Sequence, residues 1–296
     1  MTSAAPVHSA SLRALLGGAI DYAGLFPPTG LELAAALANY QAYRHSADAW
    51  ALGRFVVPVA RLGELEGLLR GGDVALTALM GAGIAVDVQL IEQFNRRSGE
   101  HGGRVESVEV KAASEAATRA MLAELPTDWI RYLEIPLDEA GDGILDALTA
   151  ARAFAKIRTG GITAGAFPPP DQVVQFLQAA GRRKLPFKAT AGLHHPLRGS
   201  YRLSYAAGAP RGVMYGFLNL LLAAAVAWVG GSAAELRAAL LEDAAAAIRL
   251  DTESLQWREV RLSAAQLGEL RQNFFHGFGS CSFREPLDEL KARGWA

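Results

Sequence analysis

The sequence has little of what several large protein classes require. It contains one cysteine, Cys281, which excludes an internal disulfide framework and a multi-cysteine zinc site and fits a reducing compartment. Lysine and arginine total 29 and aspartate and glutamate total 30, so the formal net charge is -1. Neither sign is in excess, and nothing in the bulk charge favours nucleic acid or an anionic membrane surface as a partner. A small-molecule substrate is the expected partner.

Long apolar runs and a secretion signal are also missing. The most apolar segment, residues 213–229, is shorter than the roughly 20 residues that a bilayer span needs, and it contains Asn219. The first residues, M-T-S-A-A-P-V-H-S-A, lack the basic start and apolar core of a signal peptide. We therefore expect a cytoplasmic protein without a membrane partner, in which segment 213–229 is a buried helix of the core or of a homo-oligomer interface.

Two nucleotide-binding signatures are absent. No G-x-G-x-x-G follows the first strand-like segment and opens a helix, which disfavours a dinucleotide-binding fold. A phosphate-binding P-loop motif is missing as well. The sequence therefore predicts no cofactor.

What is present is a regular alternation of strands and helices in a chain that is 51% hydrophobic. Predicted strands lie at 19–28, 54–59, 84–90, 107–112, 130–137, 155–161 and 187–193. Predicted helices lie at 31–43, 62–69, 115–124, 143–154 and 171–180. Repeated strand–helix units are typical of a parallel sheet, and this many of them, at this length, favour a closed barrel. We expect an α/β protein with a (β/α)8 TIM-barrel-like fold and one domain, 1–296.

The alternation changes after Leu193. Two helices are predicted in succession, at 211–228 and 232–248, and a charged, strand-like segment follows at 255–262. A helix at 264–273 and a closing strand at 274–283 complete the chain. We expect an irregular helical C-terminal portion, in which segment 255–262 is either a lid or an added edge strand.

Polar residues late in the predicted strands are the candidate site residues, because the site of such a barrel lies at the carboxyl ends of its strands. These residues are Asp21, Tyr22, Asp87, Gln89, Glu109, Lys111, Glu134, Lys156, Arg158, Lys188, His194, His195, His276, Arg284 and Glu285. Three of them are lysines. A neighbouring cation lowers the pKa of a lysine and makes it a nucleophile towards carbonyl carbon. Alternatively, each lysine pairs with a strand carboxylate, such as Glu109 or Glu134, in a layered ionic core.

The two later lysines carry a family resemblance. K-I-R-T-G-G at Lys156, followed by F-K-A-T-A-G-L-H from Phe187, resembles the paired lysine strands of class I aldolases of the deoxyribose-phosphate aldolase type. The resemblance spans about residues 105–195 of a divergent TIM-barrel sequence. It implies that Lys156 forms a Schiff base, that Lys188 activates it, and that Glu134 lies on the preceding strand.

The sequence departs from this family pattern at two places. Arg158 stands where the family has a small hydroxyl residue, and Ala191-Gly192 stands where the family grips phosphate with Gly-Gly. His194 and His195 follow directly. These departures predict a substrate different from that of the family.

The favoured hypothesis is a lyase that acts on a small carboxylated or phosphorylated carbonyl metabolite. Its catalytic residues would be Lys156, Lys188, Glu134 and Glu109. Its substrate-binding residues would be Arg158, His194, His195, Asp21, Tyr22, Lys111 and Arg284.

Two hypotheses of other classes stay open. His194, His195 and His276 are able to supply ligands to a divalent metal in a lyase or hydrolase, although no H-x-H or H-E-x-x-H spacing supports this. The lysines and Arg158 would also form a cationic funnel in a non-catalytic barrel that binds an anionic metabolite. Cys281, between two serines, is predicted to be a buried small residue.

Overall fold

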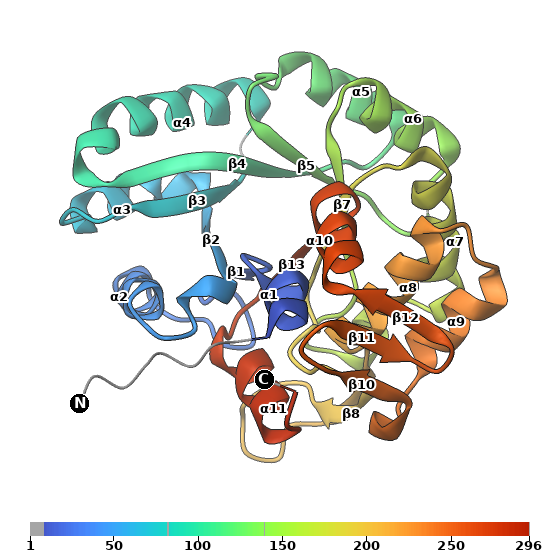
Figure 1. Ribbon diagram of the computed structural model, residues 1–296. Helices are drawn as coiled ribbons and strands as arrows, with labels where there is room; N and C mark the ends of the chain where they lie inside the picture. The colour runs from blue at the N-terminus through green and yellow to red at the C-terminus, as the bar shows by residue number, and fades with distance from the viewer. Residues whose placement is uncertain (1–8, 82, 139, 296) are drawn as a thin grey trace, which may run out of the picture.

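The fold is a closed barrel of parallel strands surrounded by helices, seen in a computed structural model that describes residues 9–81, 83–138 and 140–295 (Figure 1). In barrel order the strands are β1 (Ile20–Tyr22), β13 (Phe275–Ser280), β7 (Phe187–Thr190), β6 (Phe154–Arg158), β5 (Ile130–Glu134), β4 (Gly103–Lys111), β3 (Val74–Leu79) and β2 (Leu52–Pro58). Parallel strands covered on both faces are rich in apolar residues, and Val108, Leu133 and Ile157 are fully buried. The predicted (β/α)8 TIM-barrel-like fold is confirmed.

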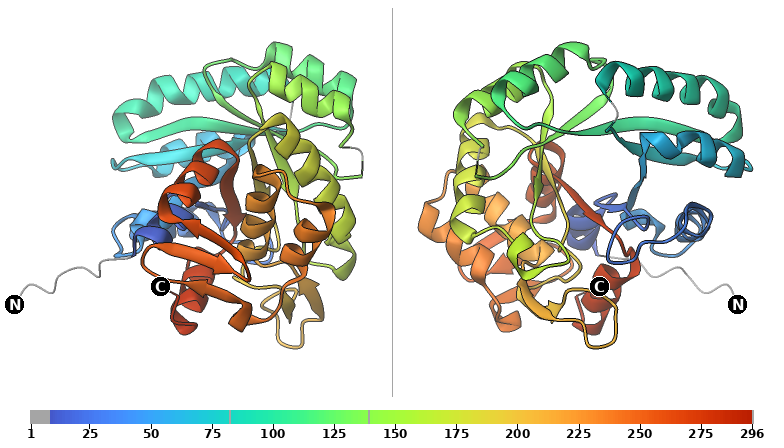
Figure 2. Two further views of the ribbon diagram at one scale, coloured as in Figure 1. Left: turned by 45° about the vertical axis from the view of Figure 1, so that its right-hand side comes forward. Right: turned by 180° about the vertical axis from the view of Figure 1, so that it is seen from behind.

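Helices on the outside of the barrel connect successive strands over the first two thirds of the chain (Figure 2). They are α2 (Leu33–Arg44), α3 (Leu62–Leu68), α4 (Ile84–Ser98), α5 (Glu115–Glu124), α6 (Asp142–Ala150) and α7 (Pro170–Arg183). Each presents an apolar stripe to the strands, as Val173, Phe176 and Leu177 do in α7. Before β1, α1 (Ala10–Leu16) packs against α10 (Ala264–Asn273).

A long insertion separates β7 from β13, which are neighbours in the barrel. It begins with the hairpin β8 (Gly199–Arg202) and β9 (Arg211–Met214) and continues with α8 (Phe217–Trp228) and α9 (Ala233–Leu241). A small antiparallel sheet of β10 (Ile248–Leu250), β11 (Ser254–Trp257) and β12 (Val260–Ser263) precedes α10. Helix α11 (Arg284–Ala292) follows β13. This insertion is the irregular portion expected after Leu193.

Helix α8 is the buried helix predicted from segment 213–229. Every residue from Phe217 to Ala227 is buried. Its polar residue, Asn219, accepts a hydrogen bond from the backbone nitrogen of Arg198 and donates to the carbonyls of Ala239 and Glu242. Among the described residues, no helix is long and apolar enough to cross a membrane.

The strand predicted at 84–90 is wrong, because these residues begin α4. The apolar alternation of Ile84, Val86 and Val88 imitated a strand, yet Val86 is 54% exposed. The buried positions of α4 are 87, 91, 94 and 98, which recur at helical spacing. Asp87 accepts a hydrogen bond from the backbone nitrogen of Gly81 and, with Gln89, lies on this outer helix rather than at a strand end. The third barrel strand is β3, which the sequence analysis did not identify.

Segment 255–262 is also different from either expectation. It forms the β11–β12 hairpin of the small sheet, where Leu255 pairs with Leu262, and β11 contacts α1. The segment is therefore part of a separate sheet beside α1, and it is not an edge strand of the barrel.

Candidate active site

A cavity of about 360 Å³ opens at the carboxyl ends of the barrel strands. Strands β4 to β7 contribute Glu109, Glu134, Lys156 and Lys188 to its wall. The rest of the wall comes from the ends of β2, β3 and β13, from the β1–α2, β6–α7 and β7–β8 loops, from the β8–β9 hairpin and from the start of α11. This is the end of a (β/α)8 barrel at which catalytic groups gather.

Strand register places the charged residues side by side. Lys111 of β4 is paired with Glu134 of β5, Glu134 with Lys156 of β6, and Lys156 with Lys188 of β7. Because side chains alternate along a strand, Glu109 lies on the same face as Lys111 but one step deeper. Glu109 is 3% exposed, whereas Lys111 is exposed at the mouth.

The buried charged side chains form a row in which positive and negative groups alternate. Lys156 Nζ lies 2.6 Å from a carboxylate oxygen of Glu109 and 2.6 Å from one of Glu134. The other oxygen of Glu109 contacts Lys188 Nζ, which also lies 3.0 Å from Asp21 Oδ2. All five side chains are buried, so each charge depends on its partners in place of water.

Arg158 extends this row of charges to the mouth of the cavity. One of its guanidinium nitrogens lies 4.0 Å from Glu134, and its side chain is 53% exposed. Arg158, Lys111 and Arg202 all line the cavity and are exposed. The entrance is therefore cationic, which favours an anionic group on the ligand.

Glu109 separates the two buried ammonium groups electrostatically. Burial by itself would raise the pKa of Glu109, but Lys156 and Lys188 more than offset it and lower the pKa to about 2. Burial by itself would lower the pKa of Lys188, but the charges of Asp21 and Glu109, together with Tyr132, raise it above the ordinary value. The structure thus pairs Lys188 with carboxylates, as in the layered ionic core considered from sequence.

Lys188 is enclosed on a third side by an aromatic ring. Its Nζ lies 4.3 Å from the centroid of the Tyr132 ring, a cation–π contact. The Tyr132 hydroxyl lies 2.8 Å from His276 Nδ1, whose Nε2 lies 3.2 Å from the carbonyl oxygen of Gln272. The partners fix the tautomer: Nε2 donates to the carbonyl and Nδ1 accepts from the tyrosine.

The turn that follows β7 has a left-handed backbone at two successive residues. Ala191 has φ of 65° and Gly192 has φ of 76°. A side chain at Gly192 would begin 2.8 Å from the Phe167 ring and 3.2 Å from the Gly160 backbone. A non-glycine residue with positive φ, such as Ala191, is strained and is often found at functional sites. This turn directs His194 and His195 to the cavity wall.

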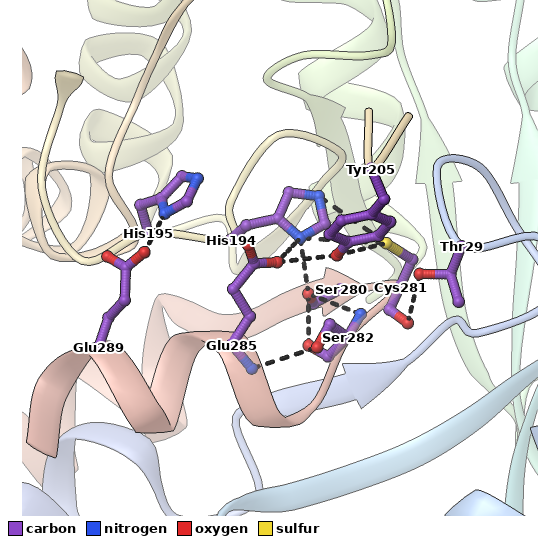
Figure 3. A network of polar contacts seen from close by, with 9 residues as sticks. All are labelled: Thr29, His194, His195, Tyr205, Ser280, Cys281, Ser282, Glu285 and Glu289. Carbon is purple, nitrogen blue, oxygen red and sulfur yellow. Dashed lines mark hydrogen bonds and ion pairs between the residues drawn. The ribbon is translucent and has the colours of Figure 1, made fainter. Parts of the chain in front are cut away.

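His194 meets a cysteine at this wall (Figure 3). Cys281 Sγ lies 3.9 Å from His194 Nε2 and 4.0 Å from Nδ1. The carboxylate of Glu285 lies 3.3 Å from His194 Nδ1 and accepts a hydrogen bond of 2.9 Å from the Tyr205 hydroxyl. Cys281 is buried, as predicted, but it lines the cavity together with His194, Glu285 and Tyr205. His194 and Glu285 were candidate site residues from sequence, but no sequence signal placed Cys281 beside them.

His195 belongs to a neighbouring cluster. Its Nδ1 lies 2.5 Å from Glu289, and its ring stacks on Tyr201 at a centroid distance of 3.4 Å. His195, Glu285 and Glu289 have potential ligand atoms within 4.8 Å of one another. Within the described ranges, His194 and His276 do not belong to such a group, so the proposed histidine trio is not brought together.

Three other candidates lie away from the cavity wall. Tyr22 is buried against Tyr43 and Phe55. Arg284 does not line the cavity and pairs with Asp48 and Asp288 at 2.5 Å each. His276 is the second residue of β13, near its amino end, and not at its carboxyl end. Strand geometry explains two of these positions: Tyr22 follows Asp21 and so faces the other side of β1, and His276 lies at the end of β13 opposite to the mouth.

Asp21, in contrast, reaches the cluster from β1 through Lys188. Its other oxygen accepts a hydrogen bond of 2.7 Å from the backbone nitrogen of Arg54, which fixes the carboxylate beside the ammonium group. The structure therefore brings together Asp21, Glu109, Glu134, Lys156, Lys188 and Arg158. Neither a protein-family model nor a curated protein sequence matches this chain.

Proposed function

We propose that this protein is a lyase that forms an imine between Lys156 and a small anionic carbonyl compound. The observation that supports this most strongly is the position of Lys156 Nζ, 2.6 Å from two buried carboxylates at the floor of a cavity with a cationic entrance. An amine at such a position reacts with a carbonyl carbon when a neighbouring base removes its proton.

The carboxylates favour the products of this reaction. A protonated imine carries the same positive charge as the ammonium group it replaces, so Glu109 and Glu134 stabilise it where it forms. Water leaves the carbinolamine only after its hydroxyl gains a proton, and Glu134 is close enough to have carried the proton taken from Lys156. The cluster therefore supplies both electrostatic stabilisation and proton transfer.

Lys156 is a better candidate than Lys188. Lys188 Nζ is held by Asp21, by Glu109 and by the face of Tyr132, and its pKa is raised. Its role in the proposal is to hold Glu109 ionised between the two lysines. Lys156 and Arg158 are two residues apart on the same face of β6, and Arg158 has the planar fork that binds a carboxylate or phosphate through two hydrogen bonds.

Reduction with borohydride tests the proposal. Purified protein is incubated with glyoxylate, pyruvate and glyceraldehyde 3-phosphate in turn, reduced, digested and analysed by mass spectrometry. We expect an adduct on the peptide that contains Lys156. Lys156→Arg keeps the positive charge but forms no imine, so the adduct should disappear, whereas the matched change Lys111→Arg at the mouth should retain it.

Two outcomes would contradict the proposal. One is an adduct that survives Lys156→Arg, and the other is no adduct with any of the carbonyl compounds. Tight binding of these anions without an adduct or turnover would instead favour the non-catalytic barrel.

A further inference from the structure

The cavity contains a second cluster of reactive side chains, separate from the lysines. Cys281 is the only thiol in the chain, and it lies at the carboxyl end of β13, the strand next to β7. His194 comes from the loop after β7, so strand adjacency brings the imidazole to within 4.0 Å of the sulfur. Both residues line the cavity, and both are less than a tenth exposed.

Glu285 orients the imidazole from the other side. It lies in the first turn of α11, and its carboxylate is 3.3 Å from His194 Nδ1 (Figure 3). The Tyr205 hydroxyl donates to the same carboxylate at 2.9 Å and lies 4.0 Å from Cys281 Sγ. A nucleophile, a base beside it and a third group that orients the base are the parts of an activated nucleophile.

We propose that Cys281, with His194 and Glu285, is a second covalent centre of the cavity, which adds reversibly to the carbonyl carbon of a small anionic aldehyde. The thiol proton moves to His194, and a sulfur electron pair forms the carbon–sulfur bond. The π pair of the carbonyl moves to oxygen, which takes a proton back from His194. The product is a thiohemiacetal, and the addition consumes no oxidant or reductant.

The electrostatics of the cluster agree with this role. Burial by itself would raise the pKa of Cys281, but the hydrogen bond and the charge of His194 lower it overall. Burial by itself would lower the pKa of His194, but Cys281 and Glu285 raise it to about 10. The pKa of Glu285 is lowered, against the effect of burial, by His194 and Tyr205. These shifts favour a thiolate beside an imidazolium.

The charge of the entrance selects the class of electrophile. Arg158 and Arg202 are exposed and line the same cavity as Cys281. A carboxylate or phosphate on the aldehyde would pair with these guanidinium groups while its carbonyl carbon reaches the sulfur. This centre does not require an imine at Lys156, so it can be tested independently of the proposed lyase activity.

Alkylation kinetics test whether the thiol is activated. Rates of modification by iodoacetate and iodoacetamide are measured from pH 5 to 9, and the single thiol makes the mass readout unambiguous. An unperturbed thiol, with a pKa of about 8.5, is only about 1% ionised at pH 6.5, so wild type should react at least about tenfold faster than His194→Gln there. The rate of alkylation by iodoacetate, which is an anion, should exceed that by iodoacetamide more in this protein than for a free thiol, because the entrance is cationic.

Matched carboxylate variants on α11 sharpen the comparison. Glu285→Gln should slow alkylation at pH 6.5, whereas Glu289→Gln, one turn further along the helix and paired with His195, should not. If His194→Gln fails to fold, the comparison of Glu285→Gln with Glu289→Gln still tests the proposal. A thiol that is unreactive at every pH, or a wild-type profile with a midpoint near pH 8.5 that neither His194→Gln nor Glu285→Gln changes, would overturn the proposal.

A labelled aldehyde tests the adduct itself. With glyoxylate carrying ¹³C at its aldehyde carbon, we expect a protein-dependent resonance of a saturated carbon bound to sulfur and oxygen, and its loss in Cys281→Ser. An imine carbon is unsaturated and resonates in a different region, so the lysine and cysteine adducts are distinguished in one spectrum. No thiol-dependent resonance at saturating glyoxylate would rule out the addition, whatever borohydride trapping shows at Lys156.

Discussion

Glu109 is the residue on which the buried charge cluster depends. One of its oxygens contacts Lys188 and the other lies 2.6 Å from Lys156 Nζ. Removing one partner of a buried ion pair is costly because the remaining charge loses its compensation and cannot regain water. Since Glu109 has two such partners, its loss affects both lysines.

We predict that Glu109→Gln lowers the free energy of unfolding by about 3–5 kcal/mol, the cost of breaking a buried ion pair. Urea-induced unfolding followed by circular dichroism measures it. The matched control is Glu106→Gln on the same strand, because Glu106 pairs with Arg54 at 3.0 Å at the surface. That change should cost less than about 1 kcal/mol. Equal losses of unfolding free energy in the two variants would show that the buried lysines do not depend on Glu109.

At the residue scale, the sequence predicted that Lys156 and Lys188 lie in the site, but it did not predict that Cys281 does. Lys156 and Lys188 were recognisable because a charged residue inside an apolar strand needs a partner, and both strands were identified. The partners of Cys281 come from positions 194, 205 and 285, which the fold alone brings together. Spacing along the chain therefore gave no sign of the cluster.

At the scale of elements, helix α8 holds the loop that carries the two histidines. The backbone nitrogens of Phe217 and Leu218 donate to the carbonyls of His195 and Pro196. Asn219 then accepts from the backbone of Arg198 and donates to two carbonyls near the end of α9. One fully buried amide thus joins α8, α9 and the wall of the cavity.

We predict that Asn219→Ala lowers the free energy of unfolding by about 2–4 kcal/mol, because it leaves buried backbone groups without partners. Thermal and urea unfolding provide the measurement. Asn273→Ala is the control, since the exposed side chain of Asn273 makes one bond within its own helix, to Glu269. That control should change stability by less than about 0.5 kcal/mol. A small effect at position 219 would contradict the bridging role.

Elements were predictable where the apolar period was unambiguous. The helices at 115–124 and 264–273 were located to the residue, and in the structure the side chains of Ser114 and Ser263 cap their first turns. The segment 84–90 failed because three β-branched or aliphatic residues alternate at the start of a helix. The third barrel strand, V-A-L-T-A-L, was overlooked because the strand predicted after the helix at 62–69 lay at 84–90 instead.

At the scale of the whole molecule, two histidines set opposite pH limits on stability. Burial, reinforced by the charges of Arg271, Lys188 and Arg54, lowers the pKa of His276 to about 4. The contacts of His194 with Cys281 and Glu285 outweigh burial and raise its pKa to about 10. An unfolded chain has both near the ordinary histidine value of about 6.5.

The signs follow from proton uptake. Between pH 6.5 and about 4, unfolding lets His276 take up a proton that the folded state excludes, so stability falls as the pH falls. Above pH 6.5, unfolding releases the proton that His194 holds in the folded state, but below about pH 8.5 the Cys281 thiolate takes up a proton on unfolding and cancels this release. Stability therefore falls with rising pH between about 8.5 and 10. Stability from the charge of Glu109 is lost only at lower pH, through its pKa of about 2.

We predict that His276→Gln flattens the decline in melting temperature between pH 6.5 and 4, because glutamine still accepts from Tyr132 and donates to the carbonyl of Gln272 but does not titrate. The effect is at most about 3 kcal/mol, the value of a pKa difference of about 2.5 units. His194→Gln should flatten the limb between about pH 8.5 and 10. Thermal unfolding across pH 4–10 measures both limbs in each variant. An acid limb of unchanged slope in His276→Gln would mean that other groups, not the imidazole bonded to Tyr132, take up the proton on unfolding.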